Sequence, residues 1–369
     1  MSALTAPWNH VGPDTPGGRT LRRAWQPVYR SCDLRPGQAV HLRALAEDFT
    51  LWRTAAGEAR LSAFRCPHRG TALYLGAVEG ERLRCMHHGW CFAADGACVE
   101  RPGEAGLVAK GGRVAIATRP LVERVGLLFA WLGEGPPPPP PSFPAWEAPG
   151  VLRVLPPEAW PCGFFQRLEN SCDFAHLPYA HAGSGVGDIV KDLSAPAAVE
   201  ADYGARVSAE GLPVVHFLMP NALVFPTPVS EQVGWRDHLV FRVPVDDHRC
   251  VSFTIVLIPS GTPGASGYRM QAPLDAPFAP SKAAKLGEAV LSGRTTLAAL
   301  KGAPNLTEVE DYVALVGQGR PEERPTEFLG RMDAPIALLR RIWRREAAAV
   351  EAGEPGRAWK GWQTLGYHD

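Results

Sequence analysis

The chain has 369 residues, 46% hydrophobic and 21% charged, which is long for one core and comfortable for two domains. Its 38 basic and 38 acidic residues cancel, which excludes a general attraction to nucleic acid or to an anionic membrane. No apolar run approaches the roughly 20 residues of a membrane span, and residues 1–18 lack the pattern of a secretory signal, so we expect a cytoplasmic protein.

Residues 20–135 have the pattern of a small all-β domain. The first 20 residues are rich in Gly, Pro and Thr and are expected to lie over the surface. Ala56-Gly57, Glu79-Gly80 and Asp95-Gly96 are typical of hairpin turns. The β-like runs between the turn signals are residues 39–45, 49–54, 61–64, 82–85, 114–118 and 127–131.

Two short Cys/His motifs lie inside this region. Cys66-x-His68 is followed, after sixteen residues, by Cys85-x-x-His88, and a glycine closes each motif. Each predicted loop brings one thiolate and one imidazole, whereas a zinc finger usually takes both cysteines from one loop and both histidines from the other. The mixed order favours a [2Fe–2S] cluster with two Cys on one iron and two His on the other. A Cys₂His₂ zinc site is the alternative.

The other six cysteines are scattered without the spacing of a disulfide framework, which favours free thiols in a reducing compartment. They are Cys32, Cys91, Cys98, Cys162, Cys172 and Cys250.

Six consecutive prolines, 136–141, predict a stiff polyproline II spacer, so we place a linker at 136–144 and a second domain at 145–369. Runs at 214–225, 239–245 and 251–259 predict an antiparallel sheet there. Asp333 is expected to cap a C-terminal helix that holds Pro335 in its first turn and ends at 353–355. The apolar face of that helix is Ile336, Leu339, Trp343, Ala347 and Val350.

A second constellation lies at residues 170–181. Asp173 and His176 are three apart, so on a helix they share one face. His176 and His181 are five apart and diverge by about 140° on an ideal helix, but Pro178 between them can bend it. Taken alone, two such histidines more often make ordinary hydrogen bonds than bind a metal. Beside an iron–sulfur domain they suit the two-histidine, one-carboxylate triad of non-haem Fe(II) oxygenases.

The third ligand should be a carboxylate on another element, and Asp311 in the helical stretch 305–316 is the best candidate. It lies opposite the apolar face of Val309, Tyr312, Val313 and Val316, where a buried carboxylate would need a partner such as a metal. Glu308 and Glu310 lie on the flanks and are interpreted as solvated.

With both constellations in view, the chain resembles the terminal oxygenase α subunit of Rieske non-haem iron oxygenases. More narrowly it is similar to the phthalate dioxygenase-like branch, which also contains aryl O-demethylases and toluenesulfonate methyl-monooxygenases. The resemblance implies an α+β fold, with an N-terminal all-β Rieske domain and a C-terminal helix-grip (Bet v1/START-like) antiparallel-sheet catalytic domain. It covers most of the chain, at 15–28, 66–70, 85–90, 166–181, 310–313, 323–330 and 340–343.

The resemblance also implies roles for single residues. Asp173 would bridge a cluster histidine of one subunit to an iron-ligand histidine of the next, and Asn170 matches a position near the iron, although a structural amide is nearly as good a reading. Two departures are His87, where an aromatic residue is common, and the motif between the iron histidines. The implied cluster ligands are Cys66, His68, Cys85 and His88, and the implied iron ligands are His176, His181 and Asp311.

The implied activity is the NAD(P)H-driven oxidation of a small organic, mainly aromatic, substrate with O₂, by hydroxylation or demethylation. Electrons would come through a separate reductase, with or without a ferredoxin, and the bridging role of Asp173 implies a homotrimer. The alternative is a Rieske electron carrier without oxygenase activity, which would need only the first ~135 residues. Candidate pocket residues, each of which is more often an ordinary strand residue, are His216, Asn221, Phe225, His238 and Arg242.

Overall fold

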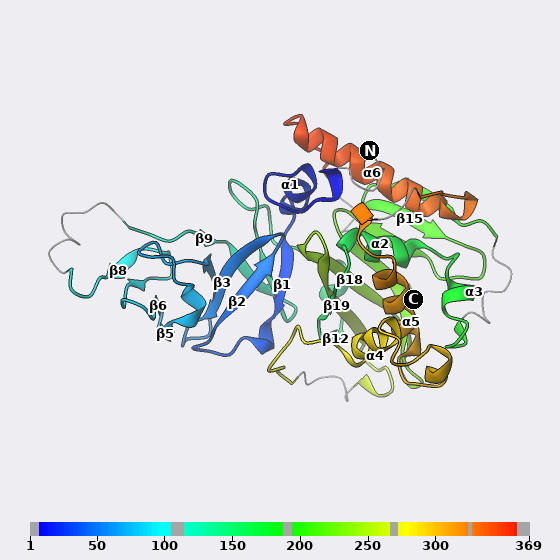
Figure 1. Cartoon of the computed structure of the whole chain (residues 1–369), viewed down its shortest axis with the longest axis horizontal. Coiled ribbons are helices and arrows are strands. Elements are labelled where there is room, and N and C mark those ends of the chain that lie inside the picture. Colours follow the sequence, from blue (N-terminus) through cyan, green and yellow to red (C-terminus); the bar gives the residue numbers. More distant parts are fainter. Residues whose placement is uncertain (1–6, 105–113, 187–193, 266–271, 324–326, 360–369) are drawn as a thin grey trace. The chain divides into compact units, whose positions relative to one another are not determined.

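A computed structural model describes residues 7–104, 114–186, 194–265, 272–323 and 327–359 (Figure 1). The chain divides into two units, and the division falls directly after the six prolines at 136–141. The first unit holds Arg22–Pro141 and Gln271–Pro277. The second unit holds Met1–Leu21, Ser142–Met270 and Phe278–Asp369.

Antiparallel strands in three small sheets build the first unit, which confirms the predicted β structure. The predicted strand at 114–118 is present only at its last residue, in β9. The sheets have the strand orders β1 (Gln26–Arg30)–β11 (Leu127–Ala130)–β10 (Leu121–Arg124), β2 (Ala39–Ala44)–β3 (Glu47–Arg53)–β4 (Ala59–Ala63)–β9 (Thr118–Arg119) and β5 (Ala77–Glu79)–β6 (Arg82–Arg84)–β7 (Cys91–Phe92)–β8 (Cys98–Glu100).

In the described hairpin turns of this unit a glycine adopts a left-handed conformation, with one exception. Gly57, Gly80 and Gly96 each turn the chain between neighbouring strands with φ of +98°, +61° and +90°. These left-handed conformations favour glycine, because it has no Cβ. The exception is the β2–β3 hairpin, which turns on Leu45 and Ala46 with φ of +50° and +63°. Neither residue type marks a turn in the sequence.

One antiparallel sheet of eight strands dominates the second unit. The predicted run at 214–225 is wrong as a single strand, because it contains β16, a turn and β17. The runs at 239–245 and 251–259 lie inside β18 and β19. The strand order is β12 (Gly150–Val154)–β19 (Arg249–Pro259)–β18 (Gly234–Asp246)–β17 (Ala222–Ser230)–β16 (Val215–Leu218)–β15 (Gly204–Ser208)–β14 (Ala197–Ala201), and β13 (Glu158–Trp160) also pairs with β19.

The described residues also form α-helices of 4 to 18 residues. Within the described ranges, none of them combines the length and the hydropathy that a bilayer crossing requires. The α-helices are α1 (Pro16–Arg22), α2 (Phe164–Cys172), α3 (Leu177–Ala180), α4 (Lys282–Leu291), α5 (Leu306–Gly317) and α6 (Ala334–Glu351).

The long helix α6 packs against β14, β15 and α2, and its predicted apolar face is buried (Figure 1). Trp343 is fully buried and meets the rings of Phe164 and Phe165 edge-on at 5.5 and 5.8 Å. Its indole Nε1 donates to the carbonyl of Pro220 at 3.0 Å. The helix ends at Glu351, before the predicted stop at 353–355. The chain is therefore an α+β protein, as predicted, and α2 is fixed between α6 and the sheet.

Candidate metal centres

The two Cys/His loops of the first unit have the same backbone structure. In each loop the glycine amide donates to the cysteine carbonyl four residues earlier, from Gly70 to Cys66 at 2.9 Å and from Gly89 to Cys85 at 3.1 Å. The cysteine amide donates to the carbonyl five residues later, at 2.9 and 2.8 Å. Both glycines have positive φ, +79° and +71°, so the closing glycine of each motif is required by the turn.

An arginine directly before each cysteine supports its loop. Arg65 Nη1 donates to the carbonyl of Gly70 at 2.9 Å, and Arg84 Nη1 donates to the carbonyl of Gly89 at 2.7 Å. Arg84 is in turn bound by one carboxylate from β5 and another from β8. These arginines fix the loop ends from outside, and the motif alone did not predict them.

The four predicted donors lie at the facing surfaces of the two loops. Cys66 and Cys85 are each 3% exposed, and burial together with the nearby Cys85 thiol raises the pKa of Cys66 to about 11. The rings of His68 and His88 are 4.5 Å apart, and His68 stacks on Trp90 at 4.6 Å. Cys66 is therefore a neutral thiol at neutral pH without a metal, and a metal that binds it must displace its proton.

These donors fit a two-iron cluster better than a single ion. His68 Nδ1 is buried and has no hydrogen-bond partner, as expected of an imidazole nitrogen kept for a metal. A tetrahedral zinc ion needs all of its ligand atoms around one point. Cys66, His68, Cys85 and His88 do not form such a group. Among the described residues, the candidate ligand atoms that do lie within 4.8 Å of one another belong to residues of the second unit.

His87, which the spacing leaves outside the donor set, joins the two loops. Its Nδ1 lies 3.0 Å from Thr71 Oγ1 in the first loop, and its ring stacks on His88 at 3.8 Å. The departure from an aromatic residue at this position therefore adds a hydrogen bond between the loops.

In the second unit, the helical structure is interrupted between α2 and α3, and this interruption orients two histidines. Asp173 follows α2, and its Oδ1 accepts the amide of Ala175 at 2.8 Å, which turns the chain out of the helix. His176 and His181 flank the single turn of α3. The sequence allowed Pro178 to bend a helix between the two histidines, but it does not, because it lies in the first turn of α3, where proline is tolerated.

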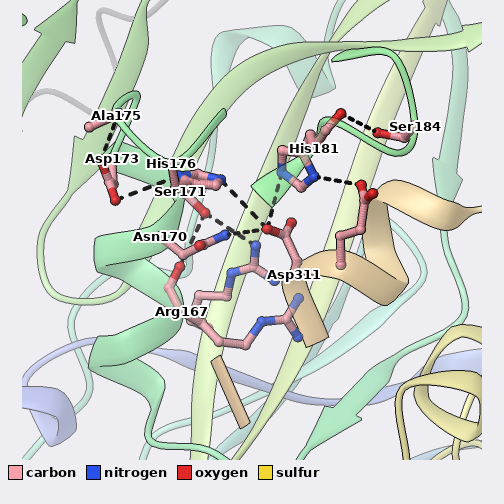
Figure 2. A network of polar contacts seen from close by, with 11 residues as sticks. Arg167, Asn170, Ser171, Asp173, Ala175, His176, His181, Ser184 and Asp311 are labelled. Atoms are coloured by element: carbon pink, nitrogen blue, oxygen red, sulfur yellow. Dashed lines mark hydrogen bonds and ion pairs between the residues drawn. The ribbon is translucent and has the colours of Figure 1, made fainter. Parts of the chain in front are cut away.

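Helix α5 brings Asp311 to these histidines (Figure 2). Asp311 Oδ1 lies 3.6 Å from His176 Nε2 and 3.3 Å from His181 Nε2. Asn170 Nδ2 donates to the same oxygen at 3.1 Å. The candidate ligand atoms of the two histidines and Asp311 all lie within 4.8 Å of one another. Two imidazoles and one carboxylate converging in this way can hold a divalent ion and leave coordination positions free.

The two histidines and Asp311 favour each other's charged forms. Burial opposes the charged form of His176, but Asp173 and Asp311 together raise its pKa to about 9. Asp311 and Glu310 likewise raise the pKa of His181 against the effect of burial. Although burial favours its protonated form, the two histidines lower the pKa of Asp311 well below its usual range. Asp311 is thus a carboxylate at neutral pH, and a bound metal ion would replace the histidine protons.

A second carboxylate lies behind each histidine. Asp173 Oδ2 is 3.6 Å from His176 Nδ1, and Glu310 Oε2 is 3.1 Å from His181 Nδ1. Histidine and glutamate in the second pair are only 2% and 3% exposed. The Glu310 acceptor at Nδ1 of His181 keeps the proton there and leaves Nε2 free to bind a metal. Asp173 makes only an ion-pair contact with His176, whose buried Nδ1 has no hydrogen-bond partner.

The interpretation of Glu310 as a solvated residue was wrong. It lies four residues after Leu306 and one after Val309, and Val313 completes the spacing i, i+3, i+4, i+7 of one helical face. That spacing was the signal that could have found it. Gly183 leaves room for the carboxylate, because a Cβ at this position would lie 2.5 Å from Glu310 Oε1.

A pocket of about 480 Å³ opens beside this group. The residues Asn170, Asp173, His176, His181 and Asp311 line one side. The remaining walls are mainly apolar and include Trp160, Phe174, Leu177, Val215, Phe225 and Trp235.

Two of the five candidate pocket residues, Phe225 and Arg242, line this pocket. The other three candidates are not among the residues that line it. The ring of His216 is hydrogen-bonded to Tyr203 at 2.7 Å, Asn221 donates to a backbone carbonyl at 3.0 Å, and His238 is 2.8 Å from the hydroxyl of Thr227. From sequence, alternation along a strand does not tell which face carries the pocket.

Comparison with known proteins gives matches to both units. The Rieske [2Fe-2S] domain family matches residues 24–115. The 5,5'-dehydrodivanillate O-demethylase oxygenase subunit of Sphingobium sp. is 30% identical over 372 residues, covering 94% of this chain and 80% of that protein. The phenoxybenzoate dioxygenase subunit alpha of Ectopseudomonas oleovorans is 30% identical over 382 residues, covering 93% of this chain and 84% of that protein.

The fold also matches solved structures. NdmA of Pseudomonas putida CBB5 superposes with a TM-score of 0.65 at 21% identity, covering 91% of this chain and 94% of that one. A likeness at this level of identity concerns the fold, and it extends over both units.

Proposed function

The chain belongs to the Rieske non-haem iron oxygenases, and from this membership we propose that its two donor groups hold the two iron centres of a terminal oxygenase that oxidises a small aromatic substrate. The enzyme is an oxidoreductase that uses a Rieske [2Fe–2S] cluster and mononuclear Fe(II). We assign electron transfer to domain 20–135 and substrate oxidation to domain 145–369, joined by the linker 136–144.

The proposed cluster ligands are the two thiolates and two imidazoles of the paired loops, Cys66, His68, Cys85 and His88. The proposed ligands of the single iron are His176, His181 and Asp311, whose candidate ligand atoms lie within 4.8 Å of one another. When bound, the cluster supplies single electrons and the iron supplies the activation of O₂. A Rieske carrier without oxygenase activity would leave the second group without a use.

The residues around the iron ligands orient them. Glu310 accepts the Nδ1 proton of His181, which directs Nε2 towards the shared site, and Asp173 lies 3.6 Å from His176 Nδ1 as its ion-pair partner. Asn170 donates to Asp311 Oδ1 and so fixes the carboxylate plane. The apolar walls of the pocket hold the substrate beside the ligands and exclude water, which protects the oxidising centre from side reactions.

We further propose a homotrimer in which Asp173 connects the two kinds of centre across a subunit boundary. Asp173 is 27% exposed next to His176, and Tyr179 nearby exposes 84% of its surface, so a neighbouring subunit can approach this segment. Light scattering should give three chains per particle. Asp173→Ala should retain all iron but slow the transfer of electrons from reduced cluster to the catalytic site in a single-turnover experiment.

The observation that carries the proposal is the convergence of His176, His181 and Asp311 in a chain that also carries the paired Cys/His loops. The test is consumption of O₂ and NADH with a surrogate reductase, over a panel of aromatic acids, methyl ethers and N-methyl compounds. At least one member should stimulate consumption and yield a hydroxylated or demethylated product. No product from any compound, with both centres fully loaded, would contradict the proposal.

A further inference from the structure

Arg242 on β18 places a charged group in the wall of the pocket without a matching carboxylate. It is 8% exposed and lines the same cavity as the iron-ligand group. Its Nη1 donates to Ser252 Oγ at 2.5 Å and its Nη2 to Ser171 Oγ at 3.3 Å. Its Nε is buried without a partner. Among the residues that the structure describes, no carboxylate lies within ion-pair distance of this guanidinium.

A second arginine adds to the positive charge at this wall. Arg167 on α2, labelled in Figure 2, also lines the pocket. It stacks over Trp160 at 3.6 Å and pairs with Glu158 at 3.3 Å. Its Nη1, like Nε of Arg242, is buried without a partner. Burial and the charge of Arg167 lower the pKa of Arg242 only to about 9, so the Arg242 guanidinium is charged at neutral pH.

A purely structural role does not account for this arrangement. Arg242 ties Ser171 of α2 to Ser252 of β19, but a neutral side chain could bridge two hydroxyl groups without burying a charge. An unpaired buried charge is strongly unfavourable, and one that faces a ligand pocket becomes favourable when an anion binds there. A planar guanidinium with free N–H groups matches a carboxylate in particular.

We propose that Arg242, with Arg167 beside it, forms an anion subsite that binds the carboxylate of an aromatic acid and directs its ring towards His176, His181 and Asp311. The apolar remainder of the pocket suits the ring. This inference rests on the proposed function and specifies its substrate class.

The first test compares ring-substituted benzoates with the matched benzamides, for example 3-methoxybenzoate with 3-methoxybenzamide. Each pair differs in one charge and has nearly the same shape. Isothermal titration calorimetry on the full, metal-loaded protein measures binding without turnover. We expect an acid to bind about 10-fold or more tightly than its amide. Equal affinities, tighter binding of the amides, or no binding of any acid would overturn the subsite.

The second test uses variants. Arg242→Gln should weaken binding of the acid about 30-fold and change that of the amide less than about threefold, and Arg242→Lys should fall between, because an ammonium cannot form the bidentate contact. Arg249→Gln is the matched control, since Arg249 is exposed at the start of β19 and pairs with Asp246. Equal losses for acid and amide would assign a structural role and overturn the proposal.

The two proposals fail in different ways. If Arg242→Gln does not fold, the comparison of acid and amide affinities in the unsubstituted protein decides whether the anion subsite exists. If neutral methyl ethers are oxidised while no acid binds, the anion subsite fails and the oxygenase stands. If the second unit takes up no iron, the oxygenase proposal fails whatever the benzoates do.

Discussion

Replacement of Glu310 tests how the structure holds the iron-ligand histidine His181. Their side chains are almost fully buried, and Glu310 Oε2 lies 3.1 Å from His181 Nδ1. Glu310→Ala removes the acceptor that keeps the proton on Nδ1, so His181 can adopt the tautomer that points a proton at the site. Loss of such an outer contact typically weakens metal binding 10- to 100-fold, or about 1.4 to 2.7 kcal/mol. Glu310→Gln should cost less, because its amide oxygen can still accept.

The assay is an Fe(II) titration against a competing chelator, after removal of the single iron under conditions that leave the cluster in place. The absorption spectrum of the cluster reports that the first unit is intact. Glu308→Ala is the matched control, because Glu308 is exposed on the same helix and its loss should leave the affinity unchanged. Wild-type affinity in Glu310→Ala would refute the reasoning, as would equal losses in the two alanine variants.

Three further outcomes follow from the contacts. Gly183→Ala should weaken Fe(II) binding in the same titration, by less than Glu310→Ala, because its Cβ would lie 2.5 Å from Glu310 Oε1 and would shift the end of that side chain without removing it. Unchanged affinity would contradict this. The pKa of His176 is raised to about 9 in the folded protein, so its contribution is fully present below about pH 6.5 and is lost as the pH rises through 9. The free energy of unfolding of the metal-free protein, measured with denaturant, should therefore fall by about 3 kcal/mol between these pH values, relative to the metal-loaded protein. The same pH dependence in both forms would contradict this. Cys66→Ser should remove the cluster colour and its sulfide and keep the single iron, and an intact cluster spectrum would exclude Cys66 as a ligand.

Local sequence predicted the features that depend on a few neighbouring residues. The two Cys/His motifs fold into matching loops because a glycine four residues after each cysteine permits the closing turn. The turns at Gly57, Gly80 and Gly96 follow from the same property of glycine. The buried face of α6 follows from its helical spacing.

The features that sequence reasoning missed depend on tertiary contacts. The β2–β3 turn uses Leu45 and Ala46, which the flanking strands hold in conformations that neither residue favours alone. Glu310 looked solvated because an acidic residue is rarely buried without a partner, and its partner, His181, is 129 residues away in the sequence. The charge of Arg242 became informative only when the sheet showed which face lines the pocket.

The most direct test of two unlike iron centres in one chain is a count of iron and acid-labile sulfide in the purified, reconstituted protein and in Asp311→Ala. The account predicts about three irons and two sulfides per chain for the unsubstituted protein, and about two irons and two sulfides for the variant. Zinc in place of iron, or an iron count of two that Asp311→Ala leaves unchanged, would contradict it.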